Sequence, residues 1–290
     1  MSLKSILVAA SGGSASNGAI ELACRIARRH GALLEGFHVR PNPEELVMAA
    51  GAGFGMPIPE KWLTQVNDEA TSAAAKTRED FVRITGEGGL RLIEARAGDT
   101  VPEGGAATWR ESTGMASDAV GRRGRFFDLV VLGRSERVAD RPSTDTVEET
   151  LLRSGRPVLL APAEAPSAFG ACVAIGWNGS APAVRAVVGA RELLGTAHRV
   201  VLITIGDEHQ DSAVEMQHSL ALHGVAAQLR HVGLVPATGV GGQLLSAARD
   251  EGADVLVMGA YGHTPWREFL FGGATRDLIG ASLLPVLLAH

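Results

Sequence analysis

The sequence predicts an α/β protein that carries two tandem copies of one open parallel-sheet domain, with helices on both faces of each sheet. Three observations indicate this fold. The chain repeats itself, short apolar runs alternate with helix-length segments, and its 290 residues exceed the roughly 100–200 of a typical domain. Hydrophobic residues make up 46% of the chain, which supplies enough apolar surface for two cores and speaks against extensive disorder.

The repeat is clearest where each copy would end, in two apolar strands separated by a helix-length segment. The matched pairs are FDLVVLG at 127–133 with ADVLVMG at 253–259, RPVLLAP at 156–162 with LPVLLAH at 284–290, and more loosely ILVAASGGS at 6–14 with VAIGWNGS at 173–180. Two prolines, Pro162 and Pro166, end the strand between the copies. We therefore expect one domain over residues 1–163 and a second over 168–290.

Strands and helices alternate within each copy. In the second copy we expect strands near 171–176, 199–205, 226–231, 254–258 and 285–289, and helices near 181–195, 210–223, 238–251 and 273–282. In the first copy we expect strands near 5–10, 33–39, 90–96, 128–132 and 157–161. These strands are short continuous runs of Val, Ile and Leu, which is typical of parallel strands buried between two helix layers.

The first copy carries two additions that the second lacks. One is a loop over 41–59, which contains Gly51-Ala-Gly-Phe-Gly55, and the other is a glycine-rich stretch around 98–105. Loops of this length inside a compact domain either act as a lid or an interface, or are simply mobile. Both interpretations stay open for the 41–59 insertion.

Charge and cysteine content argue against several classes of function. The net charge is −5, so no overall positive field attracts phosphate backbones, and we expect no nucleic-acid partner. No apolar stretch reaches the roughly 18 residues that a membrane span needs, so we expect no membrane association. Cys24 and Cys172 lie far apart in the sequence, which does not suggest a disulfide framework. We expect a soluble cytoplasmic protein.

Ligands of open parallel sheets bind beyond the carboxyl ends of the strands, where the strand order reverses. In the second copy the fourth strand runs into a glycine-rich loop from Gly259 to Thr275, and a helix follows. Glycines let backbone N–H groups approach an anion closely, and the helix N-terminus adds its positive dipole end. The loop is therefore a candidate phosphate cradle.

The spacing Gly-x2-Gly-x9-Gly in that loop, the duplicated strand order and the closing Pro-Val-Leu-Leu strand resemble the universal stress protein family in its tandem two-domain form. The resemblance covers essentially the whole chain. It implies a Rossmann-like, adenine nucleotide α-hydrolase-like fold, with ATP and Mg²⁺ as the ligand of the second domain. It also implies a stress-response factor rather than an enzyme, with at most weak ATP hydrolysis.

The same resemblance implies which residues would hold the nucleotide. Backbone amides of the loop would contact the phosphates, while the turn after the first strand and the ends of the second and fourth strands would contact the nucleoside. The implied residues are Asn178, Gly179, Ile205, Met258, Gly259, Gly262, Gly272, Gly273, Ala274 and Thr275. Two of them depart from the family pattern. Asn178 stands where an acidic residue is usual and therefore lacks its charge, and Gly273 stands where a Ser or Thr is usual.

The first copy departs further from the pattern, and we expect its nucleotide site to be lost. No second or third glycine follows Gly133, and the turn Ala10-Ser-Gly-Gly-Ser14 has no acidic residue. The carboxylates of Glu136, Asp140 and Asp145 would also repel a phosphate unless the arginines of the same loop offset them.

Several other residues favour structural roles. Thr238 suits a helix N-cap, so the glycines that follow it would open a helix rather than bind phosphate. His218 and His223 are five residues apart, which does not place both on one helix face, and no Cys/His cluster has zinc spacing, so we expect no metal site. Cys24, in a helical pattern, indicates a small core residue, and we expect no catalytic residue.

Further hypotheses concern partners. Each copy ends in an apolar strand, 158–161 and 286–289, and pairing of these two edges would give an intramolecular pseudo-dimer. A homodimer of the whole chain would be compatible with the sequence. The alternative function is a tandem stress protein that binds no nucleotide and acts through protein contacts. A third option is that the 41–59 insertion lines a pocket for an apolar small molecule, with Met48, Phe54 and Met56 at its wall.

Overall fold

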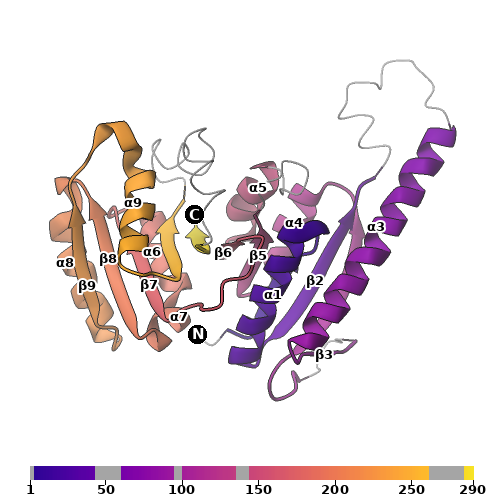
Figure 1. Ribbon diagram of the computed structural model, residues 1–290, viewed down its shortest axis with the longest axis horizontal. Coiled ribbons are helices and arrows are strands. Elements are labelled where there is room, and N and C mark those ends of the chain that lie inside the picture. The colour runs from indigo at the N-terminus through magenta and orange to yellow at the C-terminus, as the bar shows by residue number, and fades with distance from the viewer. Residues whose placement is uncertain (1–2, 43–59, 95–99, 135–143, 261–283) are drawn as a thin grey trace.

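The computed structural model describes residues 3–42, 60–94, 100–134, 144–260 and 284–290 (Figure 1). Strands and helices alternate along the chain, as the sequence pattern predicts. The first half contains β1 (Ser5–Ala9), α1 (Gly13–His30), β2 (Leu33–Arg40), α3 (Glu60–Glu87), β3 (Arg91–Leu92), β4 (Ala106–Thr113), α4 (Ala116–Gly124), β5 (Leu129–Gly133), α5 (Thr144–Ser154) and β6 (Val158–Ala161). The second half contains β7 (Cys172–Gly176), α6 (Ala181–Gly189), α7 (Arg191–Thr196), β8 (Arg199–Ile205), η2 (Asp207–His209), α8 (Gln210–Leu222), β9 (Ala227–Val232), η3 (Pro236–Thr238), α9 (Gly239–Asp250), β10 (Val255–Gly259) and β11 (Val286–Ala289).

The described strands form one sheet of 11 strands in the order β3-β4-β2-β1-β5-β6-β11-β10-β7-β8-β9. Neighbouring strands are parallel except at the centre, where β6 and β11 pair antiparallel with Leu159 opposite Leu287. The order β2-β1-β5-β6 of the first half therefore recurs in reverse as β11-β10-β7-β8, so an approximate twofold axis passes through the central pair. The predicted pairing of the two apolar closing strands is confirmed.

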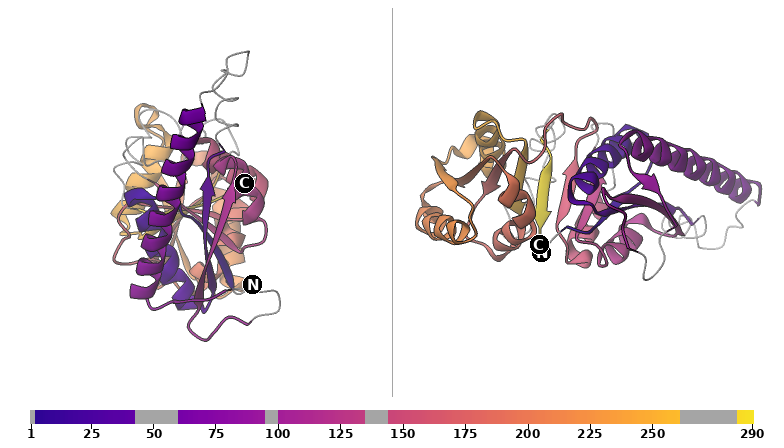
Figure 2. Two further views of the ribbon diagram at one scale, coloured as in Figure 1. Left: turned by 90° about the vertical axis from the view of Figure 1, so that its right-hand side faces the viewer. Right: turned by 90° about the horizontal axis from the view of Figure 1, so that it is seen from below.

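Helices cover both faces of the sheet (Figure 2). One apolar cluster joins residues of α1, α3, α6, α7 and α8 to one face, and a second cluster joins residues of α4, α5 and α9 to the other. Successive strand residues alternate between the two clusters, so Ile6 and Val8 belong to one and Leu7 to the other. Burial on both faces explains the continuous apolar runs, and the predicted α/β fold class is confirmed.

The third strand of the first half differs from the prediction. The sequence predicts it near 90–96, but β3 has only 2 residues and lies at the edge of the sheet. The strand that pairs with β2 is β4, in a register that runs from Leu33 opposite Ala106 to Arg40 opposite Thr113. It follows Gly104 and Gly105, whose φ angles of 85° and 89° favour glycine and form the turn into the strand. Residues 100–105 of the predicted glycine-rich addition therefore lead into a core strand.

Two predicted helices of the second half differ in detail. The helix predicted over 181–195 is split at Ala190 into α6 and α7. Thr238 stands at the N-cap position of α9, but its side chain makes no capping hydrogen bond. Instead, the Gln243 amide accepts from the Val235 N–H at 2.9 Å and donates to the Gly239 carbonyl at 3.1 Å. The glycines after Thr238 do open a helix, and Gln243 ties the start of that helix to the residue Val235 before it.

Some of the predictions fall on residues outside those that the structure describes. These are the helix over 273–282, the first-copy loop with Glu136 and Asp140, and the 41–59 insertion apart from its first two residues.

Candidate functional site

The strand order places one topological switch point in each half. In the second half the chain leaves β7 toward β8 on one side, while β10 lies on the other side of β7. The loops after β7 and β10 therefore leave the sheet in opposite directions at neighbouring carboxyl ends, and this is where open α/β sheets hold ligands. In the first half the corresponding strands are β1 and β5.

The turn after β7 has a defined hydrogen-bonding arrangement. The Asn178 side-chain oxygen Oδ1 accepts from the Ser180 backbone N–H at 3.2 Å and from the Ser180 hydroxyl at 2.7 Å. Ser180 in turn caps α6, because its Oγ accepts from the Ala183 N–H at 3.3 Å. Gly179 between them has φ of 68°, a left-handed conformation that glycine adopts without strain. Since both lone pairs of Asn178 Oδ1 are used inside the turn, the group left to meet a ligand is the amide donor Nδ2.

The start of α8 supports this turn from behind. The Trp177 indole nitrogen Nε1 donates to Ser212 Oγ at 3.1 Å, and the Ser212 hydroxyl donates to the His209 carbonyl at 3.0 Å. Trp177 is only 6% exposed, so its ring is part of the core rather than a surface on which a base could stack. The sequence analysis missed this residue, although an aromatic residue at the end of an apolar strand is a signal for such an anchor.

The strand register brings the other described candidate residues to the same edge. Met258 lies opposite Gly176, and Gly176 lies opposite Ile203, so Gly259 and Ile205 both end their strands near the Asn178 turn. Ile205 is half-buried, whereas Met258 is 0% exposed and packs in the core. Because the Met258 side chain packs in the core, only the backbone of Met258 lies at the carboxyl edge of the sheet.

Helix packing explains why a glycine stands at position 259. A Cβ atom at this position would overlap the backbone of Pro182 and Ala183, so the absent side chain lets the first turn of α6 pack directly against β10. Gly133 shows the same relation in the first half, where a Cβ atom would overlap the backbone of Ala15 in α1. Both halves therefore use a glycine to hold a helix N-terminus close to the switch point.

The rest of the predicted phosphate loop, namely Gly262, Gly272, Gly273, Ala274 and Thr275, lies outside the described residues. The aromatic and basic residues between those glycines also lie there.

A polar cluster follows the ends of β8 and β9, and the sequence analysis did not single it out. His231 has both ring nitrogens engaged: Nδ1 lies 3.3 Å from Thr204 Oγ1, and Nε2 lies 3.2 Å from an Asp207 carboxylate oxygen. The Gln210 amide donates to Asp207 at 3.1 Å and lies 3.2 Å from His231 Nε2. Because Thr204 is 3% exposed, its hydroxyl is closed off from a substrate, and the cluster ties the loop at the end of β8 to β9.

The corresponding edge of the first half is covered. The long helix α3 brings Thr77 to within 3.0 Å of the position that a Cβ atom of Gly12 would occupy, in the turn after β1. His38, at the end of β2, donates from Nδ1 to the Ala10 carbonyl at 2.6 Å and stacks on Trp109 with ring centroids 6.2 Å apart. Thr77 and His38 therefore both lie against this turn.

Arg134, the first residue after β5, turns toward the other half of the chain. Its Nη2 donates to the Leu284 carbonyl at 2.9 Å, just before β11 begins. Burial, together with the nearby positive charge of Arg249, lowers the pKa of Arg134 to about 10. This guanidinium ties the two halves of the chain together.

The two thiols are not activated. Cys24 lies on the buried side of α1, and burial raises its pKa to about 11. Burial also raises the pKa of Cys172. The interpretation of Cys24 as a small core residue is confirmed. Within the described ranges no group of three or more His, Cys, Asp or Glu side chains is arranged to hold a metal ion.

The fold defines a class: open, mostly parallel α/β proteins with helices on both faces of the sheet. Comparison with solved structures narrows this class. A universal stress protein from Archaeoglobus fulgidus DSM 4304 has a TM-score of 0.70 and 12% sequence identity, over 98% of this chain and 97% of that chain. The chain therefore has the universal stress protein fold over its whole length.

Two Pseudomonas aeruginosa structures show the same fold at lower similarity, each with a TM-score of 0.52, 15% identity and 99% of this chain covered. One, from strain UCBPP-PA14, is provisionally classed as a universal stress protein and is covered over 93% of its length; the other, from PAO1, is of unknown function and is covered over 92%. No protein-family model matches the sequence, and no curated protein matches it. None of the helices within the described residues is long and apolar enough to cross a membrane.

Proposed function

We propose that this chain acts in the cytoplasm as a tandem universal stress protein, a stress-response factor that binds an adenine nucleotide in its second half. Its two domains would span residues 1–163 and 168–290. The observation that carries the proposal is the preorganised Asn178–Ser180 turn at the switch point, next to the close approach of α6 to Gly259. A helix N-terminus held at that position favours an anionic ligand.

The described residues fit the nucleoside end of ATP. Asn178 offers its Nδ2 donor to a ribose oxygen, and Ile205 offers an apolar surface at the end of β8. The backbone amides of the loop from Gly259 to Thr275 would hold the phosphates, and a bound Mg²⁺ would offset their charge. We propose a binding and switching role rather than catalysis, in line with the family that the sequence resembles.

The test is isothermal titration of the nucleotide-free chain with ATP and Mg²⁺. We expect one binding event per chain, and we expect Gly262→Val to abolish it because a β-branched side chain prevents close approach of the backbone to phosphate. Gly195→Val in α7 is the matched control, since its Cβ position meets no atom within 4 Å. The proposed cradle is wrong if Gly262→Val binds ATP as tightly as the parent chain does.

The alternative function is a chain that binds no nucleotide and acts through protein contacts. Two observations favour it: Asn178 Oδ1 is committed to Ser180, and α3 with His38 covers the corresponding edge of the first half. Absence of heat on titration with ATP, together with no nucleotide in the purified protein, would support this alternative and overturn the nucleotide site.

A further inference from the structure

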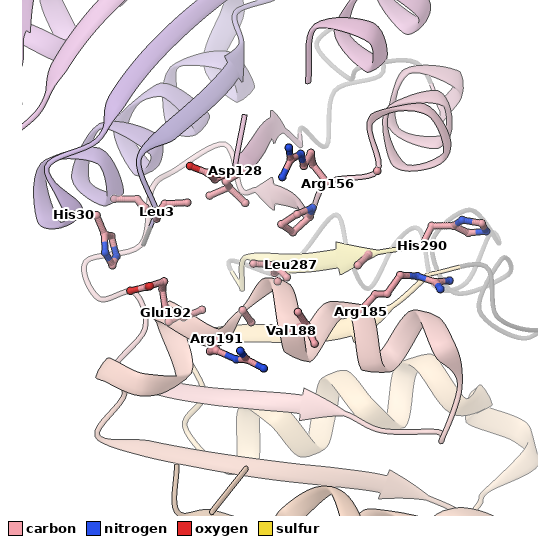
Figure 3. Close-up of a pocket in the computed structure, with 18 of the residues that line it drawn as sticks. Leu3, His30, Asp128, Arg156, Arg185, Val188, Arg191, Glu192, Leu287 and His290 are labelled. Atoms are coloured by element: carbon pink, nitrogen blue, oxygen red, sulfur yellow. The ribbon is translucent and has the colours of Figure 1, made fainter. Parts of the chain in front are cut away.

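A cavity of about 380 Å³ lies between the two halves (Figure 3), and its lining residue Ala289 pairs with Gly259 of the neighbouring strand. It opens at the amino ends of β1, β5 and β6, and its other wall is formed by α6, α7 and β11. Of the residues implied for nucleotide binding, those that the structure describes, namely Asn178, Gly179, Ile205, Met258 and Gly259, do not line it. Small-molecule sites in proteins have volumes of about 300–1,000 Å³, so the cavity can hold a small ligand.

The approximate twofold axis explains why this cavity exists. After β6 the chain continues over α1, where a Cβ atom at Gly18 would overlap the carbonyl oxygens of Pro162 and Ala163. Arg25 on α1 fastens this linker by donating to the Pro166 carbonyl at 2.5 Å. The equivalent groove beside α6 has no such cover among the described residues, and it is there that the cavity lies.

The apolar part of the cavity is a face of α6 that none of the described residues covers. Val184 and Val188 are one turn apart on α6, so they point to the same side, and they are 40% and 55% exposed. Leu287 of β11 lies opposite Val188 in Figure 3. The aliphatic residues would contact the hydrocarbon part of a ligand and remove it from water.

The charged part of the cavity favours an anion. Arg185 and Arg191 lie on either side of Val188 in Figure 3, and the described residues offer neither of them a hydrogen bond or an ion pair. Arg156 also lines the cavity; its Nε and Nη2 donate to the Arg125 carbonyl, which leaves Nη1. Guanidinium groups bind carboxylates with paired hydrogen bonds and are therefore suited to an anionic head group.

The acidic residues of the cavity do not cancel this charge. Asp128 Oδ2 accepts from the Lys4 N–H at 2.9 Å, the Ser5 N–H at 2.9 Å and the Ser5 hydroxyl at 3.1 Å, so it is used at the start of β1. Glu192 faces His30 at the opposite end of the cavity from Arg185 (Figure 3). Burial and the charge of Arg29 lower the pKa of His30, while Glu192 raises it.

We propose that this cavity binds a small amphipathic carboxylate, with its hydrocarbon part against Val184, Val188 and Leu287 and its head group at Arg185, at the opposite end of the cavity from Glu192. A neutral molecule would form no ion pair with Arg185, and a cation would be repelled by it.

The test is calorimetric titration of the full chain with decanoate below its micelle concentration, beside decanol and decyltrimethylammonium. We expect one decanoate per chain, at least tenfold weaker binding of decanol, and no binding of the cation. The variant Arg185→Gln and the cavity-filling variant Val188→Phe should each weaken decanoate binding at least tenfold. Equal affinity for decanoate and decanol, or no decanoate binding, would overturn the proposal.

Matched controls separate the cavity from folding and from the nucleotide site. Arg91→Gln at the edge of the sheet and Val214→Phe on the exposed side of α8 make the same changes elsewhere and should leave decanoate affinity unchanged. Thermal melts establish that each variant is folded. Excess ATP and the variant Asn178→Ala should not affect decanoate binding; competition by ATP would place both ligands at one site and contradict a separate cavity.

Discussion

Replacing Asn178 by aspartate, the residue type usual at this position in the family that the sequence resembles, tests how the second-half turn recognises a nucleoside. In the structure one oxygen, Oδ1, takes both Ser180 donors, and the second polar group is the amide Nδ2. In Asn178→Asp one carboxylate oxygen would keep both Ser180 hydrogen bonds. The other would replace a neutral donor by a charged acceptor for a ribose hydroxyl.

The size of the effect follows from the change in hydrogen-bond type. Net hydrogen bonds between neutral groups contribute about 0.5–1.5 kcal/mol, and those to charged groups about 1.5–3 kcal/mol. The difference of about 1 kcal/mol corresponds to about fivefold tighter ATP binding. The carboxylate would also lie near the N-terminus of α6, where a negative charge stabilises a helix by about 0.3–1 kcal/mol.

Two assays check the reasoning separately. Calorimetric titration with ATP and Mg²⁺ reports the affinity, and urea unfolding without nucleotide reports the stability of the turn. Ser11→Asp is the matched control, because Ser11 follows β1 by two residues as Asn178 follows β7, and we expect no gain of ATP affinity there. An Asn178→Asp chain that binds ATP no more tightly than the parent chain would refute the assignment of this turn to the ribose. A loss of stability would refute the described hydrogen bonds.

Two further predictions concern the first half. Arg123→Ala should lower the free energy of unfolding by about 1.5–3 kcal/mol, because it removes the two charged hydrogen bonds, at 2.7 and 2.6 Å, from the buried carboxylate of Glu35 and leaves Arg110, whose Nε lies 3.7 Å from that carboxylate, as its partner. Chemical denaturation of Arg122→Ala, whose side chain is 63% exposed and pairs with Asp118, should show a change below about 1 kcal/mol, and an equal loss in both variants would contradict the burial argument. Iodoacetamide at pH 8 should leave Cys24 unmodified in the folded chain and modify it in urea, because burial raises the pKa of this thiol to about 11. Mass spectrometry measures the modification. Fast labelling of Cys24 in the native protein would show that the thiol is accessible and contradict the prediction.

The sequence predicts the repeated core of this fold well because each core strand is buried on both faces and reads as an apolar run. It fails at β4, where the outer residues Arg110 and Glu111 are charged and two glycines precede the strand. The repeat itself also misleads here, since β9 in the second half follows a helix of 13 residues, whereas β4 follows the 28-residue α3 and a short edge strand.

The candidate site is predictable only in part. Gly259 and the Asn178 turn follow from their places after apolar strands, and their positions at the switch point depend on strand order alone. The commitment of Asn178 Oδ1 to Ser180 depends on side-chain geometry that residue types do not specify. The cavity beside α6 depends on how the linker passes over α1, and no local pattern in the sequence encodes that path.

The antiparallel pair of β6 and β11 also determines which assemblies the chain can enter. Each half satisfies the backbone groups of its closing strand with the other half, so neither strand is available to a free single-domain relative. The outer strands of the described sheet are poor templates for addition, because β3 is only 2 residues long and β9 carries the exposed polar residues Gln228 and Arg230. Because the two halves belong to one chain, they are always present in a one-to-one ratio and do not exchange as separate subunits would. Each half can therefore diverge in sequence while its partner stays the same.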